Sequence, residues 1–333
     1  FAGRLPYARA YFDSVARQTV NLASINATNL RAFPIPVPPI REQRRILARV
    51  EGLYKQSQTA RDALERVPLL IQRFREAVLS VAFRGELTER DPDAEPASVL
   101  LKRVQGERRQ KCEEELRQQG RDPAKRKHEE PVAPDLAALP QLPEGWVWTT
   151  VATLADDEPY SLTDGPFGSN LKTADYVPVG VRVIRLQNIG VGEFKDQDKA
   201  FVSEAKYKLL RKHDAKARDV LVSALAEPVG RACLVPDGVE PAIVKADCIR
   251  LRVDPRLADS TYVMLTLNTP EHYARAEAVS HGVGRLRVNL SEIRAFVVPL
   301  APLGEQLRIV AKVGTLFAQA DAAGAAVDAA RRR

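Results

Sequence analysis

The sequence has few of the residues on which disulfide frameworks and metal sites depend. Among 333 residues it has three cysteines, Cys112, Cys233 and Cys248, and four histidines without the spacing of metal ligands. An odd number of scattered cysteines argues against a disulfide framework or a zinc knot and fits a reducing cytoplasm. We therefore expect a cytoplasmic protein without a metal of its own.

Long hydrophobic runs are also missing. Apolar residues make up 45% of the chain, but no run approaches the ~20 residues that a membrane-spanning helix needs. The chain begins at Phe1 and has no charged start followed by an apolar run, so it shows no export signal. These absences predict a soluble chain that does not contact a membrane.

Catalytic motifs are absent as well. Residues 165–173 end in Lys-Thr like a phosphate-binding loop, but no glycine precedes the lysine. The sequence has no N-P-P-[FY] tetrad and no glycine-rich cofactor loop of an adenine methyltransferase. Glu204-Ala205-Lys206 and Asp214-Ala215-Lys216 have the E-x-K shape of many nucleases without a nearby Pro-Asp partner. We predict a chain that is not an enzyme by itself and binds no cofactor.

The charge is positive overall but unevenly placed. A net charge of +7 and a pI near 9.3 favour an acidic partner, nucleic acid first. Residues 146–300, however, carry 20 basic and 20 acidic residues. A neutral domain does not bind DNA by bulk phosphate attraction, so it would need local clusters and base contacts.

One stretch of the chain occurs twice. Residues 25–60 and 288–323 align without a gap at an offset of 263, with fifteen identities. Each copy has an extended apolar segment (33–37 and 296–300), a proline-stiffened turn and a helix start. A repeat with so long a period indicates a duplicated module and not a solenoid.

Both copies lead into a heptad pattern. Apolar positions alternate at spacings of four and three residues, which predicts helices that can bury each other's seams. Pro68 should kink or interrupt the first helix. The seam residues are Ile46, Val50, Leu53, Ala60, Leu64, Ile71, Phe74, Val78 and Val81 in the first helix, and Ile309, Val313, Leu316, Ala320, Ala323 and Val327 in the second.

Between the copies lies a globular domain. Short β-rich runs separated by glycine, proline and aspartate alternate with helical patterns at 203–213 and 260–278, which predicts an α+β fold with a mixed sheet. The pattern of residues 98–119 predicts a charged, solvated helix, and that of 120–143 predicts a flexible linker. The basic run Lys125-Arg126-Lys127 in this linker is either part of a soluble tether or a contact to DNA. The predicted divisions are 1–39, 40–90, 91–143, 144–300 and 301–333.

Polar loops of this domain carry side chains suited to nucleic acid. Arginine can bond bidentately to guanine, and glutamine or asparagine to adenine, while lysines suit phosphate. Ordinary surface turns and a solvated helix face remain the alternative reading. The candidates are Lys172, Arg185, Gln187, Asn188, Lys206, Lys208, Arg211, Lys212, Arg285, Arg287 and Asn289.

The sequence resembles the specificity subunit of type I restriction-modification systems. The resemblance rests on the order of several motifs and on the duplication, and it covers nearly the whole chain. The motifs are Pro38-Pro39-Ile40-Arg41-Glu42-Gln43, its degraded copy at 301–306, Ser80-Val81-Ala82-Phe83-Arg84-Gly85-Glu86-Leu87, Leu142-Pro143-Glu144-Gly145-Trp146, Asp164-Gly165-Pro166-Phe167-Gly168-Ser169 and Arg185-Leu186-Gln187-Asn188-Ile189.

The resemblance implies target-recognition domains joined by long helices packed as an antiparallel coiled coil. It implies a subunit that reads a bipartite site in double-stranded DNA while modification and restriction subunits supply the chemistry. S-adenosylmethionine, ATP and Mg are then expected on those partners. Residues 1–39 would be the tail of a first recognition domain, so we expect an N-terminally truncated chain with a short second helix.

Two other classes of function stay open at this stage. A coiled-coil scaffold would join protein partners through the heptad seams and bind no DNA. A stand-alone methyltransferase or nuclease would need a cofactor or metal site that the sequence does not display.

Overall fold

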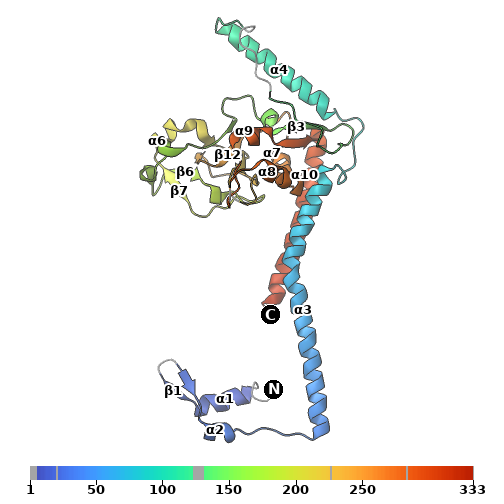
Figure 1. Cartoon of the computed structure of the whole chain (residues 1–333), viewed down its shortest axis with the longest axis vertical. Helices are drawn as coiled ribbons and strands as arrows, with labels where there is room; N and C mark the ends of the chain where they lie inside the picture. The colour runs from blue at the N-terminus through green and yellow to red at the C-terminus, as the bar shows by residue number, and fades with distance from the viewer. Residues whose placement is uncertain (1–5, 20–21, 123–130, 226, 283, 333) are drawn as a thin grey trace. The chain divides into compact units, whose positions relative to one another are not determined.

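The structure, a computed structural model, describes residues 6–19, 22–122, 131–225, 227–282 and 284–332 (Figure 1). The predicted linker run Lys125-Arg126-Lys127 lies outside these residues. The chain divides into two compact units: residues 1–67 with 331–333, and residues 68–330. The domain predicted over 144–300 belongs to the second unit.

The first unit has little core. Its elements are α1 (Pro6–Val15), the antiparallel pair β1 (Arg17–Thr19) and β2 (Leu22–Ser24), α2 (Ala27–Arg31) and the first part of α3 (Ile40–Phe83). The rings of Tyr11 and Phe12 pack on Phe33, with centroids 5.2 and 4.8 Å from it. Ala8 is the one fully buried residue among the side chains described between residues 6 and 67.

The second unit confirms the expected α+β fold with a mixed sheet. Its described strands form a four-stranded sheet in the order β10-β9-β12-β4, a five-stranded sheet in the order β5-β7-β6-β11-β8, and the pair β13-β3. Neighbouring strands are antiparallel except β6 and β11, which are parallel. The strands are β3 (Val147–Thr150), β4 (Leu162–Thr163), β5 (Tyr176–Val177), β6 (Val181–Ile184), β7 (Ala200–Val202), β8 (Asp214–Ala215), β9 (Val220–Ser223), β10 (Ala232–Leu234), β11 (Ala242–Val244), β12 (Cys248–Leu251) and β13 (Val297–Leu300).

Helices pack around these sheets and share their core. The helices are α4 (Ala97–Gln118), α5 (Val151–Leu154), α6 (Glu204–Leu209), α7 (Ser260–Thr266), α8 (Pro270–Val279), α9 (Leu290–Ala295) and α10 (Leu303–Arg331), with 3₁₀ turns η3 (Gly168–Asn170), η4 (Thr173–Asp175), η5 (Leu186–Asn188) and η6 (Arg211–His213). The largest apolar cluster joins the end of α3, the start of α10, α4, α7 and the four-stranded sheet. The long helices are therefore anchored in the domain core.

Helices α3 and α10 lie side by side and antiparallel within the second unit (Figure 1). The Arg75 guanidinium lies 5.2 Å from the centroid of the Phe317 ring and pairs with Asp321. A Cβ on Gly324 would lie 3.2 Å from Ile71 Cδ1. Because partner numbers on α10 rise as those on α3 fall, the two helices run in opposite directions. This confirms the antiparallel helix pair.

Helix α3 continues through Pro68, so of the expected kink or interruption, the interruption is wrong. Proline has no N–H to donate to the carbonyl four residues earlier, which belongs to Leu64. Within the first unit, Arg331 Nη2 donates to that Leu64 oxygen at 2.5 Å. A guanidinium thus takes the place of the missing backbone donor, which helps the helix to tolerate the proline.

The seam is buried only in part. Val78, Ile309, Val313 and Ala320 are buried. Val50, Leu64, Ile71, Val81, Leu316 and Val327 are half-buried. Ile46, Leu53, Ala60, Phe74 and Ala323 are exposed. Three of these buried positions, Val78, Ile309 and Val313, belong to the main core, whereas Ala320 lies further along α10. The strongest part of the helix pair is therefore next to the domain core.

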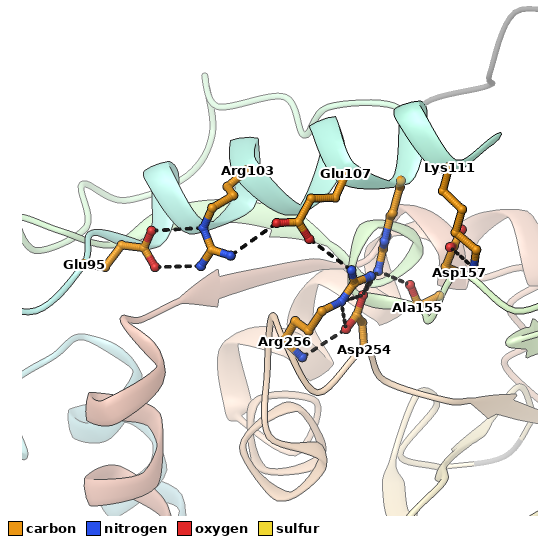
Figure 2. Close-up of polar contacts among 9 residues, drawn as sticks. Glu95, Arg103, Glu107, Lys111, Ala155, Asp157, Asp254 and Arg256 are labelled. Carbon is orange, nitrogen blue, oxygen red and sulfur yellow. Dashed lines mark hydrogen bonds and ion pairs between the residues drawn. The ribbon is translucent and has the colours of Figure 1, made fainter. Parts of the chain in front are cut away.

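Helix α4 is not the solvated helix that its charge suggested. Its residue Arg108 has a side chain 9% exposed and donates to the carbonyls of Thr153 (3.1 Å) and Ala155 (2.7 Å) and to Asp254 Oδ2 (2.6 Å). Figure 2 shows further ion pairs along the same face, which involve Glu95, Arg103, Glu107, Lys111, Asp157 and Arg256. The buried face of α4 thus combines apolar residues (Ala97, Leu100, Val104 and Leu116) with the buried charge of Arg108.

Candidate nucleic-acid interface

The candidate interface begins where two parallel strands end side by side. In the register of β6 and β11, Ile184 lies opposite Val244, and Lys245 N donates to Ile184 O at 2.9 Å. Arg185 and Lys245 therefore leave the sheet at neighbouring points of one edge. Loops that follow the carboxyl ends of adjacent strands are a common place for binding residues.

A tight turn follows β11. Cys248 N donates to Lys245 O at 3.1 Å, and Asp247 has a left-handed backbone with φ of 67°. The loop at Gly165 crosses this turn so closely that a Cβ at Gly165 would overlap the carbonyl group of Lys245. Glycine is needed there because another backbone occupies the space of a side chain.

The turn after β11 is also linked to the segment that follows α8. Asp247 O accepts from Ala224 N, and Ala224 O accepts from Val288 N, each at 2.9 Å. The side chain of Asp247 pairs with Arg287. The loops after β9, after β11 and before α9 are therefore joined by backbone bonds and by one ion pair.

The segment from α6 to η6 completes the same edge. His213 Nδ1 lies 2.5 Å from Asp164 O, and Lys206 Nζ lies 3.1 Å from Asp175 Oδ2. Burial is the main cause that lowers the pKa of His213, so its imidazole is neutral at pH 7. We name residues 164–175, 185–188, 204–213, 245–247, 281–282 and 284–289 the recognition edge.

The recognition edge separates charge within a neutral domain. It carries nine of the 20 basic residues of 146–300 but four of the 20 acidic ones. The rest of the domain is correspondingly acidic. This polarity gives a local cationic surface despite the zero balance, which is what a selective binder of an anionic polymer requires.

Eight of the sequence candidates have exposed side chains on this edge. They are Lys172, Gln187, Lys208, Arg211, Lys212, Arg285, Arg287 and Asn289. With its amide oxygen turned toward Arg185, Gln187 accepts from Nε at 3.2 Å and from Nη2 at 3.1 Å. Arg185 also donates to the carbonyl of Asp198. The side chains of Arg185 and Gln187 are thus hydrogen-bonded to each other, and both are of types that can bond to the edge of a base.

The side chains of two candidates make hydrogen bonds that hold the backbone. Asn188 is 0% exposed; its amide donates to Lys195 O at 2.8 Å and Gln197 O at 2.9 Å, and its Oδ1 accepts from Arg185 N at 2.9 Å. Asn289 caps α9 by accepting from Glu292 N at 3.0 Å. Asn188 therefore cannot read a base, and the carbonyl oxygen of Asn289 is already used.

The basic residues between positions 206 and 218 do not all lie on this edge. Lys206 is tied to Asp175 across the edge, whereas Arg218 pairs with Asp259 at 2.9 Å. Arg218 precedes β9, and the loop at Ala224 follows that strand, so the two lie at opposite ends of it. Lys208, Arg211 and Lys212 remain with the edge.

Lys245 and Asp247 were missed from the sequence. The Lys245 ammonium lies 5.7 Å from the centroid of the Tyr176 ring, and Asp247 holds Arg287. Neither residue stands in a motif. Their place depends on the parallel pairing of β6 with β11, which sequence periodicity does not specify.

Membrane and metal sites do not appear in the described part of the chain. No helix there is long and apolar enough to cross a bilayer. No group of three or more His, Cys, Asp or Glu residues within it could hold a metal ion.

Comparison with known proteins points to one group of proteins. The chain is 23% identical over 314 residues to the specificity subunit of the type I restriction enzyme EcoBI of Escherichia coli, covering 93% of this chain and 57% of that protein. For the EcoKI specificity subunit of Escherichia coli strain K12, identity is 24% over 306 residues, covering 90% and 54%. The chain thus spans about half the length of these relatives. No protein-family model matches it.

Solved structures share the fold. The HsdS subunit from Thermoanaerobacter tengcongensis superposes with a TM-score of 0.53 at 18% identity, covering 96% of this chain and 62% of that one. A chain from work on complex assembly and conformational transition of the type I R-M system gives 0.55 at 19%, covering 89% and 56%. Along most of its length the chain is similar to type I specificity subunits in both sequence and fold.

Proposed function

We propose that this chain is a DNA-recognition subunit of a type I restriction-modification complex, with residues 144–300 reading one half of a bipartite site. The observation that carries the proposal is the charge separation at the recognition edge, where nine basic residues accompany four acidic ones. Lysines 208 and 212 suit phosphates, whereas Arg185 with Gln187 suits base edges. Both kinds of contact are needed for selective binding.

The helices serve this function as a spacer. Helix α3 has 44 residues and is therefore about 66 Å long at 1.5 Å per residue. Its end is packed with α10 into the core of the recognition domain. A rod fixed in this way can set the distance between two recognition domains and offer a surface to modification subunits.

Catalysis belongs to the partners in this proposal. Modification subunits would bring S-adenosylmethionine for adenine methylation, and a restriction subunit would bring ATP and Mg for cleavage. This chain would position them on DNA in the cytoplasm. Residues 1–39 would then be the end of a first recognition domain, followed by a spacer helix at 40–90.

The test is selection of a binding site from random duplexes by this chain together with a modification subunit. We expect enrichment of one short defined half-site, because the recognition edge combines exposed basic side chains with base-type donors. A coiled-coil scaffold would yield no enriched sequence while still retaining the modification subunit. Absence of any enriched site from a complex that does assemble would contradict the proposal.

A further inference from the structure

Arg287 is held more firmly than the other exposed arginine on its loop. Arg287 N donates to His281 O at 2.9 Å, and His281 N donates to Arg287 O at 2.8 Å. A second bridge joins Arg287 to Leu225. The backbone of Arg287 is thereby fixed between two neighbours, whereas Arg285 lies between these anchor points and is exposed.

The side chain of Arg287 is held as well. It is 50% exposed and pairs with Asp247, which is 23% exposed. One guanidinium N–H is used in this bond, and the group has five. Enough donors remain for two parallel bonds to a ligand, and the orientation is set before the ligand arrives.

Asp247 stands where the backbone favours another residue. It is the third residue of the turn closed by Cys248 N and Lys245 O, and its φ is 67°. Such a turn favours glycine or asparagine at this position. Strained backbone of this kind clusters at functional sites, and aspartate is one of the few non-glycine residues that tolerate it. An aspartate there is explained by its carboxylate, which holds Arg287.

We propose that Arg287, oriented by Asp247, reads a guanine in the target half-site, an inference that rests on the proposed function and deepens it. Arginine recognises guanine by bidentate bonds to O6 and N7 in the major groove. A phosphate is the weaker alternative, because the carboxylate of Asp247 beside it would repel a second negative charge. The edge of a base carries no such charge.

The experiment measures discrimination in the complex of the full chain with its modification subunit. The selected half-site is altered one base pair at a time, and binding of each duplex is compared for wild type, Arg287→Ala, Arg287→Lys and Asp247→Gly. We expect Arg287→Ala to lose about 10- to 100-fold of discrimination at one G·C pair and none elsewhere. Arg287→Lys keeps the charge but loses the planar fork, so it should lose the same discrimination.

The variant Asp247→Gly distinguishes a loss of base discrimination from a loss of stability. Glycine suits the left-handed turn, so the melting temperature should stay the same or rise, while discrimination at the same G·C pair falls. Arg218→Gly is the matched control. Arg218 also has a φ of 67° and pairs with a carboxylate, Asp259, but it lies at the other end of β9. This control should leave discrimination unchanged.

Three results would overturn the inference. Arg287→Ala could weaken all duplexes equally, which indicates a phosphate contact. The affected position could be an A·T pair. Asp247→Gly could retain full discrimination. If instead the wild-type complex selects no sequence at all, it is the proposed function that fails.

Discussion

At the scale of single residues, burial and hydrogen bonds together decide whether a carboxylate stays ionised. Burial alone would raise the pKa of Asp254, but hydrogen bonds from Arg256 and Arg108 outweigh it and hold that pKa below its ordinary value. Asp254 therefore stays ionised inside the domain and binds α4 through Arg108. Loss of one partner from such a pair leaves a buried charge without compensation, which is the costly outcome.

His272 predicts a loss of stability in acid. Burial, with Arg275 nearby, lowers its pKa from 6.5 to about 3. Between these values the unfolded chain binds a proton that the folded chain does not. The free energy of unfolding should therefore be greatest above pH 6.5 and fall by about 1.4 kcal/mol per pH unit toward pH 3 from this residue.

Urea unfolding followed by tryptophan fluorescence checks this, because both tryptophans, Trp146 and Trp148, are in the second unit. His272→Leu should unfold with a shallower dependence on pH between 6.5 and 4 than wild type. Equal slopes for the two proteins would show that His272 is not the proton-binding group.

The two copies of the repeat form the same local turn in different surroundings. Gln43 and Gln306 each donate to the carbonyl five residues earlier, at 2.8 and 2.9 Å. Gln306 also donates to Leu257 O and accepts from Asp259 N, both at 3.0 Å, and it is fully buried. The same local turn is therefore exposed in one copy and in the core in the other.

The packing of α10 predicts that two neighbouring substitutions in this helix differ sharply in their effect on stability. Ile309 is 0% exposed in the main core, whereas Leu307, two residues earlier, is 55% exposed. Ile309→Ala should cost about 2–5 kcal/mol, because it removes buried methyl groups and leaves a cavity. Leu307→Ala should stay within about 0.5 kcal/mol as the matched control. Urea midpoints measure both, and similar losses would contradict the packing of α10.

Charge acts at the scale of the whole molecule. The zero balance of residues 146–300 hides a basic recognition edge and an acidic remainder. If residues 144–300 bind DNA as proposed, this polarity directs one side of the domain to the DNA, and the affinity should depend on salt through the few phosphates that this side meets.

Replacing Lys208 and Lys212 with alanine should weaken binding to all sequences alike. If each lysine meets one phosphate, the slope of log K against log salt should become shallower by about 0.9 for each. Lys102→Ala is the control, since Lys102 is exposed on α4. The measurement is a salt titration of duplex binding. An unchanged slope in the double variant would remove these lysines from the interface.

Several features were predictable because they depend on local order in the sequence. The duplication located α3 and α10. The β-rich runs at 146–151, 181–186, 220–223, 232–235, 249–253 and 296–300 lie at or within two residues of β3, β6, β9, β10, β12 and β13. The helix expected over 260–278 is instead α7 and α8, because Thr269 caps a new helix that begins at Pro270.

By itself, the sequence determined the repeat, the helix pair, the α+β domain and the loops that bear arginine and lysine, because heptads, strand alternation and turn residues act over a few positions. Only the tertiary structure decided that Asn188 is buried, that Arg108 enters the core and that Asp247 holds Arg287. The last of these depends on β6 pairing in parallel with β11 across about 60 residues. Contacts between distant segments follow from packing of the whole domain, which no local pattern encodes.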